Sequence, residues 1–282
     1  MADLNAVKNH FQRLNQYYKK SRIGYDILLW KSKHFGFHPI GKKISEKKAQ
    51  TLMQDLIGKE LNLSEEMLVL DAGCGRGVVP LHLARKFACR IEGIDIVPFE
   101  IERAKSIISK SNISNKVNCS VMDYSKTNFK DDYFDAVYTM ETLSHSINIK
   151  KTLREIFRVL KSKGKIALFE YTIAEDKKFS PREKEILNEV IDASAMTGLK
   201  NLRHDKFQKL LEKSGFKNIK AENISENVKP SLNRFKKFAI APYFLVSLIS
   251  RRKHHPNLTT AIEFPKMAEK DLIRYVIFTA EK

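Results

Sequence analysis

One short segment limits the possible folds of this chain more than any other feature. The apolar run 67–71 ends in a carboxylate and continues into Gly73, Gly75 and Gly77, and a helical pattern follows at 80–87. Glycines let a backbone turn sharply and let a ligand approach it closely, and the first turn of a helix offers free N–H groups. A buried strand, a glycine loop and a helix in this order predict an α/β fold with a ligand site at the end of the strand.

The alternation of strand and helix continues along the chain. Further helices are predicted at 98–109 and 150–160. Strands are predicted at 67–71, 90–95, 116–122, 134–140, 164–170, 218–224 and 272–278, with the last two at the sheet edge. This pattern predicts a doubly wound, Rossmann-like, mostly parallel sheet of seven strands.

Length and composition are those of an ordinary folded protein. The 282 residues suffice for one large domain or two small ones. The chain is 43% hydrophobic and 30% charged, a composition that excludes a disordered tail or a membrane bundle. Cys74, Cys89 and Cys119 are widely spaced, which argues against a disulfide scaffold or a cysteine-rich zinc site. From these cysteines we expect no metal and a reducing, cytoplasmic location. No apolar run follows a basic start, so we expect no signal peptide.

The net charge of +18 is unevenly distributed. Residues 1–60 carry +7, residues 61–199 carry +1 and residues 200–282 carry +10. Basic ends around a neutral middle suit a polyanion, an anionic membrane surface or an acidic substrate. A generally lysine-rich surface would give the same charge without such a partner.

Three stretches lie outside the alternating pattern. Residues 1–60 have helical patterns broken near 36–41, and we expect them to form a helical cap over the substrate. Residues 61–282 would form the ligand-binding domain, with helical lid insertions at 171–214 and 229–266. Long excursions near a sheet edge are usually functional when they are ordered.

A second carboxylate strengthens the case for a nucleoside-like ligand. Asp95 ends the next predicted strand, and in an alternating sheet it faces the same cleft as Asp71. A carboxylate in that place can accept hydrogen bonds from both hydroxyls of a ribose. A dinucleotide site is one interpretation, but its fingerprint is Gly-x-Gly-x-x-Gly. Here the spacing is Gly73-x-Gly75-x-Gly77 behind an acid.

This arrangement resembles the S-adenosylmethionine site of class I methyltransferases over residues 67–170. Successive motifs of that family match residues 69–75, 93–95, 122–124, 134–138 and 160–165. The resemblance implies S-adenosylmethionine as cofactor, with its methionine part against residues 71–77, its ribose on Asp95 and its adenine on Asp123 and Tyr124. The cofactor-binding residues implied in this way are Asp71, Gly73, Gly75, Asp95, Ile96, Asp123, Tyr124 and Met140.

The segment after the fourth strand limits the acceptor. Nucleic-acid amino-methyltransferases carry Asn/Asp-Pro-Pro-Tyr at this place, and the RNA C5 enzymes carry Pro-Cys. Here residues 139–145 are Thr-Met-Glu-Thr-Leu-Ser-His. We therefore expect a small-molecule acceptor and no nucleic acid.

The predicted cap is rich in aromatic residues. Residues 11–37 hold seven of the 27 aromatic residues, and the only tryptophan of the chain is one of these seven. Helix packing explains part of this, and an aromatic wall that shields an apolar substrate and attracts positive charge is the functional alternative. The stretch resembles the start of sterol and tocopherol C-methyltransferases, although Lys31 and Ser32 replace the glycine that usually follows the tryptophan. The substrate-binding residues that we expect are Tyr17, Tyr18, Tyr25 and Trp30 of the cap and Phe244 of the late lid.

Two candidates for proton transfer follow the fourth strand. Glu141 and His145 lie where the same group carries Met-Glu-x-x-x-His, near the expected methyl group. Either side chain could accept a proton, directly or through water. Alternatively, Glu141 caps a helix and His145 packs beneath the lid.

The late lid contains a 12-residue apolar run, 238–249, between two basic clusters. This run is too short to span a bilayer. It could lie in the membrane interface with Arg251, Arg252 and Lys253 toward anionic headgroups. A lid helix buried on the domain is the alternative, and the two hypotheses are compatible.

Taken together, these patterns favour a methyltransferase that C-methylates a lipophilic small molecule, such as a sterol, an isoprenoid or a quinol-like ring. Two alternatives stay open at this point. One is N-methylation of a small amine, which would need convergent polar groups in the lid. The other is a cofactor-binding protein without catalysis.

Overall fold

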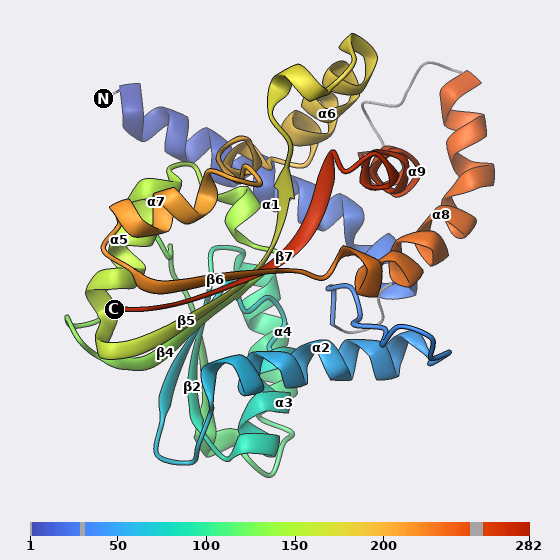
Figure 1. The fold of residues 1–282 in the computed structure, drawn as a ribbon. Coiled ribbons are helices and arrows are strands. Elements are labelled where there is room, and N and C mark those ends of the chain that lie inside the picture. The colour runs from blue at the N-terminus through green and yellow to red at the C-terminus, as the bar shows by residue number, and fades with distance from the viewer. Residues whose placement is uncertain (1, 29–31, 249–255) are drawn as a thin grey trace.

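The computed structural model describes residues 2–28, 32–248 and 256–282. Its centre is a seven-stranded sheet in the order β3-β2-β1-β4-β5-β7-β6 (Figure 1). Strands β1 to β5 are parallel to their neighbours, whereas β7 runs antiparallel to both β5 and β6. The strands are β1 (Leu68–Ala72), β2 (Arg90–Asp95), β3 (Val117–Val121), β4 (Phe134–Met140), β5 (Leu160–Ile173), β6 (Lys217–Asn223) and β7 (Ile273–Glu281).

Helices cover both faces of this sheet. The set α2, α3 and α4 packs on one face, and α5 and α7 pack on the other (Figure 1). The helices are α1 (Ala2–Leu28), α2 (Glu46–Leu61), α3 (Val78–Phe87), α4 (Pro98–Ile108), α5 (Ile149–Val159), α6 (Pro181–Ala193), α7 (Phe207–Lys213), α8 (Ser225–Leu248) and α9 (Pro256–Glu269).

The helix starts follow from local sequence. The side chain of Ser45 caps α2, that of Asn148 caps α5, and Ser180 with Glu183 forms a capping box before α6. These side chains satisfy backbone N–H groups that have no partner within the helix. In α4, proline stands in the first turn, where its missing N–H costs nothing.

The order of strands places the site. Successive crossovers lead outward from β1 to β2 and β3, and then back to β4 on the other side of β1. In an open parallel sheet, ligands bind where this order reverses, at the carboxyl ends of the strands. The carboxyl ends of β1 and β4 therefore mark the expected site.

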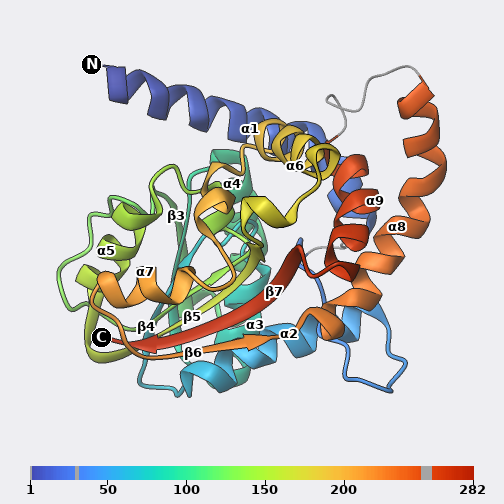
Figure 2. The same ribbon diagram turned by 45° about the horizontal axis from the view of Figure 1, so that its top comes forward.

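A layer of helices lies over that end of the sheet. Figure 2 shows α1, α6 and α9 side by side there, with α8 next to α9. Tyr17 of α1 donates a hydrogen bond of 2.6 Å to Asn257 of α9, and Arg13 of α1 donates to the backbone oxygen of Asp192 in α6. Helix α1 of the cap is thus hydrogen-bonded to both α6 and α9.

The predicted fold class is confirmed, with two differences in detail. Strand β7 lies inside the sheet, between β5 and β6, so that β6 alone forms that edge. Strand β5 continues to residue 173 because it pairs with β7 over its whole carboxyl half. No helix in the described ranges is long and apolar enough to cross a membrane.

Candidate active site

The glycine loop opens directly onto a cavity. Gly73 has a φ of +113°, and a Cβ there would lie 2.4 Å from Thr142. Gly75 has a φ of +49° and lines the cavity, and a Cβ there would meet nothing within 4 Å. Glycine at 73 is therefore required by packing, whereas glycine at 75 leaves backbone exposed to whatever fills the cavity.

Asp95 lies at the base of this loop. Its Oδ2 accepts the N–H of Gly75 and its Oδ1 accepts the N–H of Val97, both at 2.9 Å. Burial raises the pKa of this carboxyl, and the two backbone donors oppose that rise. Each oxygen keeps a lone pair, so the carboxylate can accept two further hydroxyl donors, as a ribose diol requires.

A second, smaller cavity adjoins the first. Ile96, Asp123 and Tyr124 line it, together with residues from α1. Asp123 accepts hydrogen bonds from the backbone and side chain of Ser125, which fix the carboxylate. The Tyr124 hydroxyl donates to the Thr142 carbonyl oxygen at 3.1 Å. A cavity lined by the Tyr124 ring and one fixed carboxylate suits a purine with an exocyclic amino group.

The two cavities share part of their lining. Gly73, Asp95, Tyr18, Thr142 and His145 border both of them. A ligand with a nucleoside at one end and an amino-acid chain at the other can therefore lie across both. S-adenosylmethionine therefore fits this pair of cavities, with the glycine loop, the Asp95 carboxylate and the Asp123 carboxylate as its contacts.

Asp71 lies at the inner wall of the larger cavity. Its Oδ2 accepts a hydrogen bond of 2.6 Å from the Tyr138 hydroxyl of β4. Burial raises the pKa of Asp71 to about 8, while the bond from Tyr138 works against that rise. Tyr138 is completely buried, so this pair is part of the core as well as of the site.

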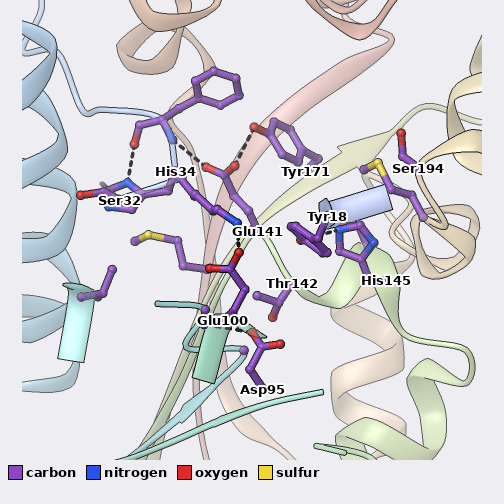
Figure 3. A pocket seen from close by; sticks show the side chains of 18 of the residues that line it. Tyr18, Ser32, His34, Asp95, Glu100, Glu141, Thr142, His145, Tyr171 and Ser194 are labelled. Carbon is purple, nitrogen blue, oxygen red and sulfur yellow. Dashed lines mark hydrogen bonds and ion pairs between the residues drawn. The ribbon is translucent and has the colours of Figure 1, made fainter. Parts of the chain in front are cut away.

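Glu141 is a buried carboxylate in the wall of the larger cavity. Figure 3 shows its carboxylate turned toward Tyr171 and away from Asp95 and Glu100 across the cavity. It accepts hydrogen bonds from the Phe35 N–H at 3.0 Å, the Tyr171 hydroxyl at 3.1 Å and the Tyr275 hydroxyl at 3.0 Å. Burial raises its pKa to about 7, although all three donors lower it.

The backbone of Glu141 is also unusual. Its φ is +57°, a left-handed conformation that residues other than glycine rarely adopt. Glu170 of β5 holds the segment that follows, because its Oε1 accepts from the N–H groups of Thr142 and Leu143 and from the hydroxyl of Thr139. Glu141 therefore does not cap a helix, and a buried carboxylate fixes the turn in which it lies.

His145 lies beneath the cap. Its Nδ1 is 3.2 Å from the Ala195 carbonyl oxygen, which can only accept, so the neutral ring carries its proton on Nδ1. Its Nε2 then accepts from the Tyr18 hydroxyl, also at 3.2 Å. Burial lowers the pKa of His145 to about 4. The ring packs against Tyr17 and Tyr18 of α1.

A charged cluster closes the cavity beside the glycine loop. The Lys33 ammonium lies 2.6 Å from Oε1 of Glu100, and Nε of Arg76 lies 3.3 Å from Oε2. The ammonium also lies 4.9 Å from the centroid of the Tyr18 ring. Burial lowers the pKa of Lys33, and Glu100 opposes the change. This cluster joins the cap to the glycine loop and to α4.

The structure assembles most of the predicted site residues and excludes one. Asp71, Gly73, Gly75, Asp95 and Met140 line the larger cavity, and Ile96, Asp123 and Tyr124 line the smaller one. Tyr17 and Tyr18 line the larger cavity as well. The expectation for Phe244 is wrong, because this side chain is 62% exposed on α8 and is not part of the lining.

Some predictions fall outside what the structure describes. Trp30 and the basic residues Arg251, Arg252 and Lys253 lie outside the described residues. Tyr25 lies in α1, but its side chain is outside the described part. Among the described residues, no cluster of three or more His, Cys, Asp or Glu side chains could hold a metal ion.

Sequence reasoning missed several residues that build the site. Tyr171 and Tyr275 come from β5 and β7, and the backbone of Phe35 comes from the cap. Glu170 could have been noticed, because an acid within an otherwise apolar strand is rarely buried without a role. No local signal distinguishes Tyr171 or Tyr275 from ordinary strand tyrosines.

The chain is similar to known methyltransferases and to a related cyclase. Residues 70–168 match the model of a methyltransferase domain. The chain is 32% identical to an S-adenosyl-L-methionine-dependent Diels-Alderase of Talaromyces variabilis, over 90% of this chain and 87% of that protein. The chain belongs to the class I S-adenosylmethionine-dependent methyltransferase family. S-adenosylmethionine is the cofactor of this family, which confirms the prediction from the glycine loop.

Other relatives are named for different activities. The sterol 24-C-methyltransferase of Saccharomyces cerevisiae is 25% identical over 80% of this chain and 58% of its own length. Among solved structures, the cyclase SpnF superposes with a TM-score of 0.80 at 22% identity, covering 96% of each chain. The cyclopropane synthase MmaA2 of Mycobacterium tuberculosis superposes with a TM-score of 0.82 at 14% identity, covering 97% of this chain and 98% of that one. These two likenesses concern the fold.

Proposed function

We propose that this protein transfers a methyl group from S-adenosylmethionine to a carbon atom of a lipophilic small molecule. The observation that carries the proposal is the composition of the larger cavity. The glycine loop and the Glu141 carboxylate line this cavity together with a set of apolar side chains, Phe35, Leu232, Phe235, Phe264 and Met196. The sterol 24-C-methyltransferase relative supports a lipophilic acceptor and transfer to carbon. A tocopherol O-methyltransferase of Arabidopsis thaliana, 28% identical over 76% of this chain and 62% of its own length, supports the lipophilic acceptor alone, because it is named for transfer to oxygen and not to carbon as expected from the sequence.

The lining suggests a mainly apolar acceptor with a small polar end. Asn257 and Thr260 of α9 line the cavity, and Asn257 is oriented by the hydroxyl of Tyr17. A small polar amine would leave the surrounding apolar side chains without contact. Residues 1–60 would act as the cap of this cavity, and the insertions 171–214 and 229–266 as its lids.

When bound, S-adenosylmethionine supplies a methyl group that is already activated on a positively charged sulfur. The protein must then orient the acceptor, exclude water and manage charge. If an alkene carbon attacks the methyl group, positive charge develops on the neighbouring carbon of the acceptor. The rings of Tyr18, Phe35 and Tyr171 line the cavity where they can stabilise that charge by cation–π attraction.

Loss of a proton from the acceptor completes such a C-methylation. Glu141 suits this step better than His145. A general base works best when its pKa is near the operating pH, and the pKa of Glu141 is about 7 whereas that of His145 is about 4. Nε2 of His145 is also engaged by Tyr18. We assign proton acceptance to Glu141 and positioning of the Tyr18 side of the cap to His145.

Ring closure by cycloaddition is a second candidate function. The 32% identity to a Diels-Alderase across nine-tenths of the chain favours it. A cycloaddition forms its new bonds without proton loss and without methyl transfer. It would use the same apolar cavity and would make Glu141 dispensable as a base.

One experiment tests the proposal and separates the two candidates. The protein is incubated with fractionated organic extract and methyl-labelled S-adenosylmethionine, and a parallel reaction contains S-adenosylhomocysteine instead. Label in the organic phase, in a product heavier than its precursor by one CH₂ group, supports methyl transfer. A product of unchanged mass that forms with either cofactor would replace methyl transfer by cyclisation, and label in nucleic acid would refute the proposal.

A further inference from the structure

Exposed apolar side chains gather on two neighbouring segments. Among the side chains that the structure describes, seven large apolar residues are exposed, and four of them belong to the cap loop 39–43 and to α8. Ile40 is 80% exposed, Phe238 57%, Ile240 54% and Phe244 62%. Figures 1 and 2 both place the cap loop, which precedes α2, and α8 at the same side of the molecule.

Helix α8 is held on the domain by a different set of side chains. The inner face of α8 packs through Phe235, Ala239 and Tyr243 against α9, where Ala261 and Ile262 are buried. The hydroxyl of Tyr243 donates to Glu263 of α9 at 3.1 Å. The opposite side of the same helix leaves Phe238, Ile240 and Phe244 more than half exposed to solvent.

The surroundings of these residues are positively charged. Helix α8 carries four basic residues and one acidic residue, Glu226, which pairs with Lys229 at 3.1 Å. Lys237 is exposed on α8, and Lys42 and Lys43 are exposed on the cap loop. No acid occurs between residues 227 and 262. Apolar side chains that protrude among lysines are the pattern of a surface that lies in the headgroup region of an anionic bilayer.

The same two segments adjoin the acceptor cavity. Leu232 and Phe235 of α8 line it. The N–H of Gly36 in the cap donates to the hydroxyl of Ser231 in α8 at 3.1 Å, and the N–H of His38 donates to the carbonyl oxygen of Asn227 at 2.9 Å. The exposed face is therefore the outer side of the wall that encloses the cavity.

We propose that the cap loop and the outer face of α8 form a docking face for anionic phospholipid bilayers, comprising Ile40, Lys42, Lys43, Lys237, Phe238, Ile240 and Phe244. Docking would place the acceptor cavity next to the membrane, from which a lipophilic acceptor can be drawn. The drawing of an acceptor from the membrane rests on the proposed function, whereas docking itself does not.

Vesicle sedimentation tests the docking face. The full chain, with S-adenosylmethionine present, is mixed with vesicles of phosphatidylcholine alone or with a one-third share of phosphatidylserine. We expect stronger binding to the anionic vesicles, and weaker binding at high salt because headgroup attraction is screened. Replacing Lys43 and Lys237 by Gln should weaken binding by about fivefold per charge, whereas replacing Lys110 and Lys130, which are exposed elsewhere, should leave it unchanged.

The apolar residues are tested with a matched pair of variants. The double change Ile40→Ser and Phe244→Ser should reduce binding to anionic vesicles at least tenfold, because burying such side chains is worth more than that factor. Val121→Ser removes an apolar side chain that is 49% exposed on β3 and should have no effect. Cofactor affinity, measured by calorimetry, should be unchanged in every variant, which separates this test from the proposed function.

Two outcomes would overturn the proposal. Equal sedimentation with neutral and anionic vesicles would remove the electrostatic part of the argument. A dimer seen by light scattering that the double change Ile40→Ser and Phe244→Ser disrupts, together with no vesicle binding, would assign the face to a second copy of the chain.

Discussion

Replacing Glu141 by Gln tests the chemistry of the site most directly. The change keeps the size of the side chain and removes its charge. In the wild type the carboxylate accepts three hydrogen bonds, one from the backbone of Phe35 and two from Tyr171 and Tyr275. The amide oxygen of Gln can still accept one or two of them, so the turn should keep its shape while the base is lost.

The pKa of Glu141 sets the size of the effect. With a pKa of about 7, the carboxyl is about half ionised at pH 7 and mostly ionised one unit above it. A reaction that needs the ionised base should therefore slow about tenfold per unit below pH 6 and level off above pH 8. Loss of a positioned base typically costs a factor of about 10² to 10⁴. We expect Glu141→Gln to reduce kcat at least about a hundredfold. The remaining rate should no longer fall at low pH, so the acid limb of the pH–rate profile should disappear.

The same raised pKa has a consequence for stability. The folded protein binds this proton more tightly than the unfolded chain, whose glutamate has a pKa of 4.5. The contribution of Glu141 to stability is therefore complete below pH 4.5 and is lost as the pH rises through about 7. The difference amounts to about 3 kcal/mol. Glu141→Gln should flatten this part of the stability–pH curve.

Three measurements decide the matter. Single-turnover rates of label transfer between pH 5.5 and 9 report the base, calorimetry with S-adenosylmethionine reports the cofactor site, and denaturant unfolding across the same pH range reports the buried carboxyl. A Glu141→Gln variant with the wild-type rate and the wild-type pH profile would refute the assignment and leave water as the acceptor. It would also agree with the cycloaddition alternative, for which no base is needed.

The remaining predictions concern the cofactor site and its support. Asp95→Ala should weaken S-adenosylmethionine binding in calorimetry by tenfold or more, because each hydrogen bond to a charged group contributes about 1.5–3 kcal/mol; unchanged affinity would contradict the ribose assignment. Gly75→Ala should reduce cofactor affinity, because its Cβ enters open cavity space, and should also lower Tm, because alanine is strained at a φ of +49°; normal cofactor affinity would contradict this. Tyr138→Phe should lower the free energy of unfolding by about 1–3 kcal/mol, since buried Asp71 loses its donor; a variant as stable as the wild type would show that Asp71 finds another partner.

The cofactor half of the site could be predicted from sequence because its determinants are local. The glycine loop, Asp95 and Asp123 each follow a predicted strand, and parallel strands bring their carboxyl ends to one edge. For the same reason the core strands were located to within a few residues, except that β5 extends to pair with β7.

The acceptor half could not be predicted in the same way. Glu141 receives its hydrogen bonds from Phe35, Tyr171 and Tyr275, which are up to 240 residues apart in the chain and meet only in the folded sheet. Phe244 illustrates the opposite error. An aromatic residue in an apolar run was expected to face the substrate, but the helical periodicity of α8 turns Phe235 inward and leaves Phe244 exposed.

The contact between cap and carboxylate leads to a last prediction, which concerns Gly36. A Cβ on Gly36 would lie 2.5 Å from the Cβ of Ala49 and 2.9 Å from its backbone, so the loop of the cap must shift away from α2. Overpacking of this kind costs about 1–3 kcal/mol. The shift should also withdraw the neighbouring N–H of Phe35, which lowers the pKa of Glu141. Gly36→Ala should therefore move the acid limb of the pH–rate profile to higher pH. Gly41→Ala is the matched control. It lies five residues further along, in the cap loop 39–43, where a Cβ strains a φ of +76° but meets nothing within 4 Å. If Gly36→Ala destabilises the protein while the acid limb stays in place, the cap does not tune Glu141, and its hydrogen bond to Phe35 serves only to close the cavity.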